Sequence, residues 1–75
     1  MTVREFCLIK TQTGELCVFR DRGWVVSAFY IDSEDLFVID YGILAREVKA
    51  DEWGTLPIVT KHGDPLMIPC HYIDV

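Results

Sequence analysis

Cys70 and His71 are the residues whose types come closest to catalysis, because a thiolate next to an imidazole is a common nucleophilic pair. They are neighbours in the chain, however, and neighbouring side chains on a strand point to opposite faces. A catalytic dyad would therefore have to join Cys70 to His62 across a hairpin. Isolated cysteines usually pack in the core, so we expect no enzymatic activity.

Metal binding is the second chemistry to consider, because the chain has five possible zinc ligands: Cys7, Cys17, Cys70, His62 and His71. Structural zinc sites usually contain cysteine pairs two to four residues apart, and no such pair is present. We expect no metal and no cofactor. An odd number of cysteines without an export signal argues against disulfides, and we expect Cys7 and Cys17 to pack, facing each other if the register allows.

The charge of the chain is unevenly distributed. Its formal net charge is -5, of which residues 1–30 contribute 4 - 3 = +1 and residues 31–75 contribute 3 - 9 = -6. Such a balance disfavours direct binding to nucleic acid, which relies on Lys and Arg. An acidic surface could instead block a basic site on a nucleic-acid-handling protein, as small inhibitors of mobile elements do, and its candidates are Asp32, Glu34, Asp35, Asp51 and Glu52.

Length and hydropathy predict one small domain, residues 1–75. No apolar stretch approaches the roughly 20 residues that a membrane-spanning helix needs, and no export signal is visible at the N-terminus. We therefore expect a cytoplasmic protein without a membrane segment.

Turn residues divide the chain into stretches of strand length. Residues 3–10 and 15–20 flank a turn that contains Gly14, which predicts a first hairpin. Residues 24–31 follow a second turn and are almost continuously apolar, so we predict a central strand covered on both faces, with Trp24 closing the core. Residues 36–39 form a fourth apolar run.

The rest of the chain contains one ambiguous segment and one clear hairpin. Residues 41–53 have apolar residues at helical spacing, with Asp40 as a possible N-cap, but Gly42 and a turn-like segment at 49–52 fit strands equally well. Residues 55–61 and 66–75 flank a strong turn at 62–65, which predicts a terminal hairpin. Pro57 and Pro69 should lie at strand starts, edges or bulges.

The C-terminal stretch, residues 53–73, resembles the distal part of an SH3 domain. Trp53 is followed by a turn with Gly63 and then by Ile68-Pro69-Cys70-His71-Tyr72-Ile73. The resemblance implies a groove of Trp53, Pro69 and Tyr72 that binds polyproline II peptides. The hairpin before Ala28-Phe29-Tyr30 and a shortened acidic loop depart from the family.

Together these patterns predict a mainly β fold: a small antiparallel five- or six-stranded SH3-like barrel or curled sheet, with at most one short helix within residues 41–53. Exposed aromatic residues are common in binding sites, so we expect a non-enzymatic module that binds a protein or peptide. Its candidate binding residues are Trp53, Pro69, Tyr72 and Tyr30. A homodimer formed through an uncovered strand edge is a further option.

Overall fold

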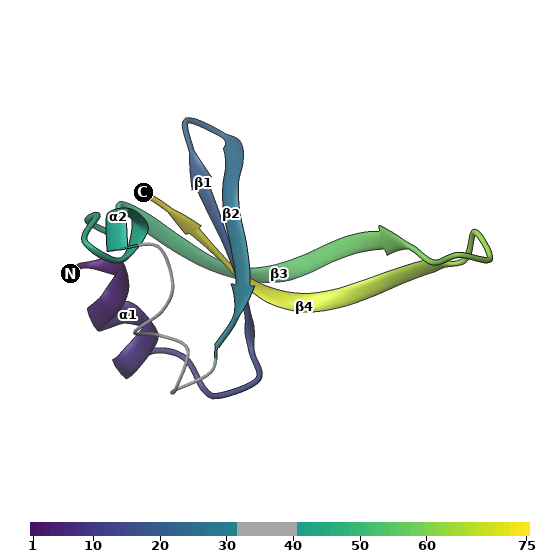
Figure 1. Cartoon of the computed structure of the whole chain (residues 1–75), viewed down its shortest axis with the longest axis horizontal. Coiled ribbons are helices and arrows are strands. Elements are labelled where there is room, and N and C mark those ends of the chain that lie inside the picture. The colour runs from purple at the N-terminus through teal and green to yellow at the C-terminus, as the bar shows by residue number, and fades with distance from the viewer. Residues whose placement is uncertain (32–40) are drawn as a thin grey trace.

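A computed structural model describes residues 1–31 and 41–75 of the chain. Its elements are α1 (Val3–Ile9), β1 (Leu16–Asp21), β2 (Trp24–Tyr30), α2 (Tyr41–Leu44), β3 (Ala50–Val59) and β4 (Pro65–Asp74). The strands form one sheet in the order β2-β1-β4-β3, and both helices lie at the end of the molecule near the N-terminus (Figure 1). The mainly β class is therefore confirmed.

The N-terminal segment is a helix, so the predicted first hairpin is wrong. Thr2 caps α1 by accepting a hydrogen bond from the Glu5 backbone N–H at 3.2 Å, and the Glu5 carboxylate accepts one from the Thr2 N–H at 3.1 Å. This reciprocal capping box stabilises the first turn of a helix. The buried residues Val3, Phe6 and Cys7 have the spacing of a helix face rather than a strand face.

The predicted second turn and the predicted terminal hairpin are confirmed. β1 and β2 pair antiparallel through a tight turn in which Arg22 and Gly23 both adopt positive φ, at 54° and 84°. β3 and β4 pair antiparallel along their whole length, and the loop between them contains Gly63 at φ 81°. Two consecutive residues with positive φ match the right-handed twist of a hairpin, which explains why glycine follows Arg22.

The sheet is mixed, which corrects the expectation of purely antiparallel pairing. β1 runs parallel to β4, with Leu16 opposite Cys70 and Arg20 opposite Asp74. This pairing makes β1 and β4 the inner strands and leaves β2 at one edge, so the predicted central position of residues 24–31 is wrong. In the described part of the chain β2 and β3 do not pair with each other, so the sheet has four strands and stays open, whereas five or six strands in a barrel or a curled sheet were expected.

Residues 41–53 contain both a helix and a strand. α2 occupies Tyr41–Leu44 only, and β3 begins at Ala50, so the short helix is confirmed, and the alternative of a turn at 49–52 is replaced by the start of a strand. The apolar run at 36–39 and the proposed cap Asp40 lie outside the described residues. No described helix is long and apolar enough to cross a membrane.

The two faces of the sheet differ in what covers them. We call one the covered face, because α1 packs on it, with Val3, Phe6 and Cys7 against Cys17 and other buried side chains. We call the opposite one the open face, where Leu16, Val18 and Cys70 form a second, smaller cluster with their neighbours on the same face: Leu56, Ile68 and Tyr72. No described helix packs in this second cluster.

The hairpin of β3 and β4 extends well beyond β1. β4 pairs with β1 only from Cys70 to Asp74, whereas it pairs with β3 back to Pro65. The extension, residues 55–59 and 65–69, protrudes from the body and is called the arm (Figure 1). Pro57 and Pro69 both lie where one side of the strand has no partner in the described sheet, which agrees with their predicted edge positions.

Candidate binding surface

The four predicted binding residues separate into two pairs on opposite faces. Trp53 lies opposite His71, and Pro69 lies two residues before His71, so both belong to the covered face. Tyr72 lies next to His71 in β4 and therefore belongs to the open face, as does Tyr30, which is paired with Leu16. Trp53, Pro69 and Tyr72 therefore do not line one groove.

Trp53 is both exposed and held in one orientation. Its side chain is 58% exposed. The indole meets the His71 ring edge-on, with 4.6 Å between ring centroids and 74° between planes. Such an edge-to-face contact is favourable for aromatic pairs, and it restricts the rotation of the indole.

His71 is the support for this tryptophan, and sequence reasoning did not identify that role. Its ring also meets Phe6 of α1 edge-on at 5.9 Å. The His71 Nε2 lies 3.2 Å from the Glu15 carboxylate. The geometry does not fit a hydrogen bond, but the distance allows an ion pair when the ring is protonated. The Gln12 backbone N–H donates to Glu15 at 2.6 Å and lowers the pKa of that carboxyl, which keeps it ionised. Only the β3–β4 register could have shown that His71 lies under Trp53.

The arm side of the surface next to Trp53 is uncharged. Alternation along β3 and β4 places Thr55, Pro57, Met67 and Pro69 on the same face of the arm as Trp53. We call these five residues the Trp53 surface. Asp51, two residues before Trp53 in β3, lies on the same face and carries a charge. No charged residue occurs in residues 53–60 or 65–70, so the arm adds no carboxylate or ammonium to this surface. Such a surface suits an apolar partner.

Tyr72, by contrast, is used in packing. Its ring lies over the backbone of Gly54, where an added Cβ would meet the ring at 3.0 Å. The Arg20 guanidinium lies 4.7 Å from the ring centroid on the open face, and the hydroxyl donates to the Thr55 carbonyl at 2.8 Å. Arg20 is held in turn by an ion pair between its Nε and the Asp74 carboxylate, at 2.8 Å. These contacts leave the Tyr72 side chain little freedom to bind a partner.

The aromatic residues at the other edge of the sheet are exposed. Tyr30 is 57% exposed at the end of β2. Trp24, which was expected to close the core, is 78% exposed at the start of the same strand. The prediction failed because it assumed a central strand, whereas β2 has a neighbour on one side only in the described sheet.

The acidic residues of the alternative site do not converge in the described structure. Asp51 and Glu52 are neighbours on β3 and point to opposite faces. Glu52 is paired with Arg20 at 3.1 Å, which neutralises part of its charge. Asp32, Glu34 and Asp35 lie outside the described residues.

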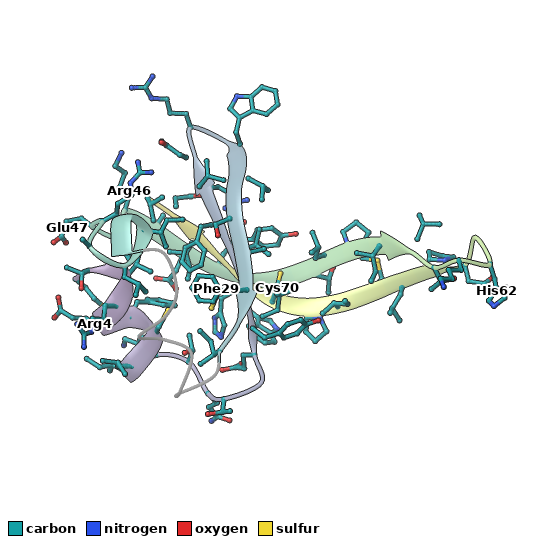
Figure 2. All side chains as sticks on the ribbon, viewed as in Figure 1. Arg4, Phe29, Arg46, Glu47, His62 and Cys70 are labelled. Atoms are coloured by element: carbon teal, nitrogen blue, oxygen red, sulfur yellow. The ribbon has the colours of Figure 1, made fainter. Side chains whose placement is uncertain are left out.

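The cysteines lie in the two apolar clusters. Cys7 and Cys17 lie in the same buried cluster and interact with each other as expected, but from α1 and β1 rather than across a hairpin. The contact with Cys7 and then burial raise the pKa of the Cys17 thiol, which keeps it protonated. Cys70 lies in the centre of the sheet and His62 at the far end of the arm, so these two form no dyad (Figure 2).

Two further features of the surface concern metal ligands and a hollow. No three His, Cys, Asp or Glu side chains gather at metal-binding distance within the described ranges. A hollow of about 430 Å³ lies at the end of the sheet remote from the arm and is lined by Arg20, Arg22 and Lys49, among others. None of the four predicted binding residues lines it.

Comparison with known proteins gives no matching family model, no matching curated protein and no matching solved structure.

Proposed function

We propose that this chain is a non-enzymatic protein-interaction module, which binds an extended apolar or proline-containing segment of a partner through the Trp53 surface. The observation that carries the proposal is the state of Trp53, which is 58% exposed and yet held by an edge-on contact with His71. Exposed, well-oriented tryptophans are frequent centres of protein interfaces.

The contacts beneath Trp53 favour a binding role, because they hold the exposed indole in one place. The indole contacts His71, which contacts Phe6 in the core of the covered face, so the tryptophan is coupled to the rigid body of the protein. A side chain that is already ordered loses less conformational entropy when a partner binds it. The two prolines of the surface are also rigid, so they too lose little conformational entropy when a partner binds.

The chemistry of the Trp53 surface favours a polypeptide as the ligand. Its residues offer apolar and aromatic contacts but no charge. Phosphate groups and other strongly charged ligands would lose their hydration there without gaining an ion pair. An extended segment with proline or aliphatic side chains could pack on the indole and the two prolines.

The test uses the full chain as bait and two tryptophan variants. Partners from the host are captured with the wild-type protein, identified by mass spectrometry, purified and titrated by calorimetry against each variant. Trp53→Ala should weaken binding by about tenfold or more, as expected for a central interface tryptophan. Trp24→Ala, at the opposite edge of the sheet, is the matched control and should bind as the wild type does.

The salt dependence of the same titration separates this function from the acidic inhibitor. Binding to the Trp53 surface should change little with ionic strength, whereas carboxylates on a basic site should lose affinity steeply as salt rises. A Trp53→Ala variant that folds by circular dichroism and binds the purified partner as tightly as the wild type would rule out the proposal.

A further inference from the structure

His71 lies at the centre of a group of side chains on the covered face. Its ring meets the Trp53 indole edge-on at 4.6 Å and the Phe6 ring edge-on at 5.9 Å. Its third neighbour is the Glu15 carboxylate, which lies 3.2 Å from the His71 Nε2. Phe6 belongs to the core of the covered face, whereas Trp53 is exposed. His71 therefore connects the rigid body of the protein to the proposed binding residue.

The Nε2 of His71 is a buried polar atom without a hydrogen-bond partner. Buried polar atoms are nearly always paired, so an unpaired one calls for a physical explanation. In the neutral ring this nitrogen is either a lone pair that faces a carboxylate or an N–H that does not point along a bond. Protonation gives Nε2 a hydrogen and the ring a positive charge, and both then match the Glu15 carboxylate.

Glu15 is a fixed and ionised partner for this ring. Its carboxylate accepts from the Gln12 backbone N–H at 2.6 Å, and its backbone carbonyl accepts from the Ile31 N–H at 2.7 Å. The bond from Gln12 lowers the pKa of the Glu15 carboxyl, which therefore stays mostly ionised at pH 5. The His71 side chain remains 15% exposed, so its ring can exchange protons with solvent.

The other titratable and charged groups around His71 come from the three elements packed against it. β1 places the Cys17 thiol opposite His71, and its raised pKa keeps that thiol protonated. The Cys7 thiol of α1 interacts with Cys17. On β3, Asp51 lies on the same face as a diagonal neighbour of His71. The charged residues in and next to α1 are exposed: Arg4, Glu5 and Lys10.

We propose that His71 is a pH switch for the Trp53 surface: the protonated ring pairs with Glu15 and holds Trp53 in its binding orientation, and the neutral ring releases it. The inference rests on the proposed function of that surface and adds its regulation. Histidine is the side chain whose charge ordinarily changes between pH 5 and 8.

The contacts of His71 explain how its charge reaches the tryptophan. The ring must turn to bring Nε2 into line with the Glu15 carboxylate, and the indole in contact with the ring turns with it. A charge-assisted hydrogen bond then holds the ring, and the ring holds the indole. An ordered indole loses less conformational entropy when a partner binds, so the surface binds more tightly in acid.

The first test uses the free protein and does not depend on a partner. Nitrogen-15 relaxation gives an order parameter for each tryptophan indole N–H, which is higher for a more rigid group. The order parameter of Trp53 should be higher at pH 5.5 than at pH 8, and the change should follow the titration of the His71 ring signals. Trp24, at the other edge of the sheet, should have the same order parameter at both pH values.

Three variants assign the change to the pair of His71 and Glu15. Glu15→Gln keeps an oxygen that accepts from Gln12 but removes the charge, and it should abolish the pH dependence of Trp53, as should His71→Gln. His62→Gln is the matched control and should behave as the wild type does, because His62 is exposed at the far end of the arm (Figure 2). A wild-type Trp53 that is equally ordered at both pH values overturns the proposal. So does an equal change in wild type and Glu15→Gln.

The second test is the affinity for the partner captured with the wild-type chain, measured by calorimetry at pH 5.5 and pH 8. The wild type should bind about fivefold or more tightly at pH 5.5, as is usual for two coupled sites, and Glu15→Gln should remove this difference. Equal wild-type affinity at both pH values, with Trp53→Ala still weakened, overturns the switch and leaves the proposed function intact. Undiminished binding by Trp53→Ala rules out the proposed function itself, and the order parameters of the free protein then still support or overturn the control of Trp53 by His71.

Discussion

Tyr72 and Gly54 show how one small residue positions a large one. The Tyr72 ring lies against the Gly54 backbone, its hydroxyl donates to the Thr55 carbonyl, and the Arg20 guanidinium lies 4.7 Å from the ring centroid. The tyrosine is thereby committed to the open face, and Trp53 remains as the exposed aromatic residue of the β3–β4 hairpin. The binding proposal therefore depends on Trp53 and not on Tyr72.

Gly54→Ala should destabilise the protein by about 1–3 kcal/mol, because the new Cβ would meet the Tyr72 ring at 3.0 Å. Urea unfolding measures the change in the free energy of unfolding. In a Tyr72→Ala background the same substitution should cost almost nothing, since the opposing ring is gone. An equal cost in both backgrounds would contradict the close contact.

The three thiols should be unreactive in the folded protein. All three cysteines are buried, and the contact with Cys7 together with burial raises the pKa of Cys17. Iodoacetamide, followed by mass spectrometry, should therefore modify none of them at neutral pH and all three after denaturation. Rapid modification of the native protein would instead indicate an exposed thiolate.

Helices, strands and turns could be predicted where the signal lies in neighbouring residues. They could not be predicted where an element depends on contacts that are distant in the chain. The turns at 21–23 and 62–65 are set by their own glycine residues, so the second turn and the terminal hairpin could be predicted. The position of β2 depends on β1 pairing with β4, some 50 residues away in the chain, and no local pattern reports that contact. The exposure of Trp24 could not be predicted for the same reason.

α1 is the exception, because its local signal was present and was overlooked. The order Thr2-Val3-Arg4-Glu5 fits a capping box, but the apolar, strand-like composition of residues 3–10 was given more weight. Within the candidate site, the exposure of Trp53 was a reasonable expectation. The separation of Trp53 from Tyr72 follows from alternation on adjacent strands and becomes visible only once the register is known.

Thr2→Ala should destabilise the protein by about 1 kcal/mol, because the Glu5 N–H loses its cap. Thr2→Ser retains the hydroxyl and should recover most of that loss. The comparison is made by thermal unfolding followed by circular dichroism. Identical stability of Thr2→Ala and the wild type would show that the capping box does not hold α1.

At the scale of the whole molecule, the chain combines a helix-covered body with a protruding arm. Its radius of gyration is 12.6 Å, above the roughly 11 Å expected for a compact domain of this length. The proposed partner surface lies on the arm side of the sheet.

Acid should destabilise the fold through its paired carboxylates. The hydrogen bond from Arg46 lowers the pKa of Asp21, and the bond from the Thr2 backbone lowers the pKa of Glu5. Groups with a lowered folded pKa stabilise the protein above their unfolded pKa, and this contribution is lost as pH falls through the folded value. Urea midpoints should therefore be level near neutral pH and decrease below about pH 4.

The Asp21→Asn variant is the control for this pH dependence. It removes one titrating group whose ion pair with Arg46 joins the β1–β2 turn to the segment after α2. Its stability should be lower than that of the wild type at neutral pH and should decrease less in acid. A parallel decrease for both proteins would assign the effect to other carboxylates.

The binding proposal depends on Trp53 and Tyr72 lying on opposite faces of the sheet, which nuclear Overhauser contacts between side chains can establish. We expect contacts between the Trp53 indole and the His71 ring, and between the Tyr72 ring and the Gly54 α-protons. We expect no contact between the Trp53 and Tyr72 rings. A strong contact between these two rings would contradict this arrangement and restore a single aromatic groove.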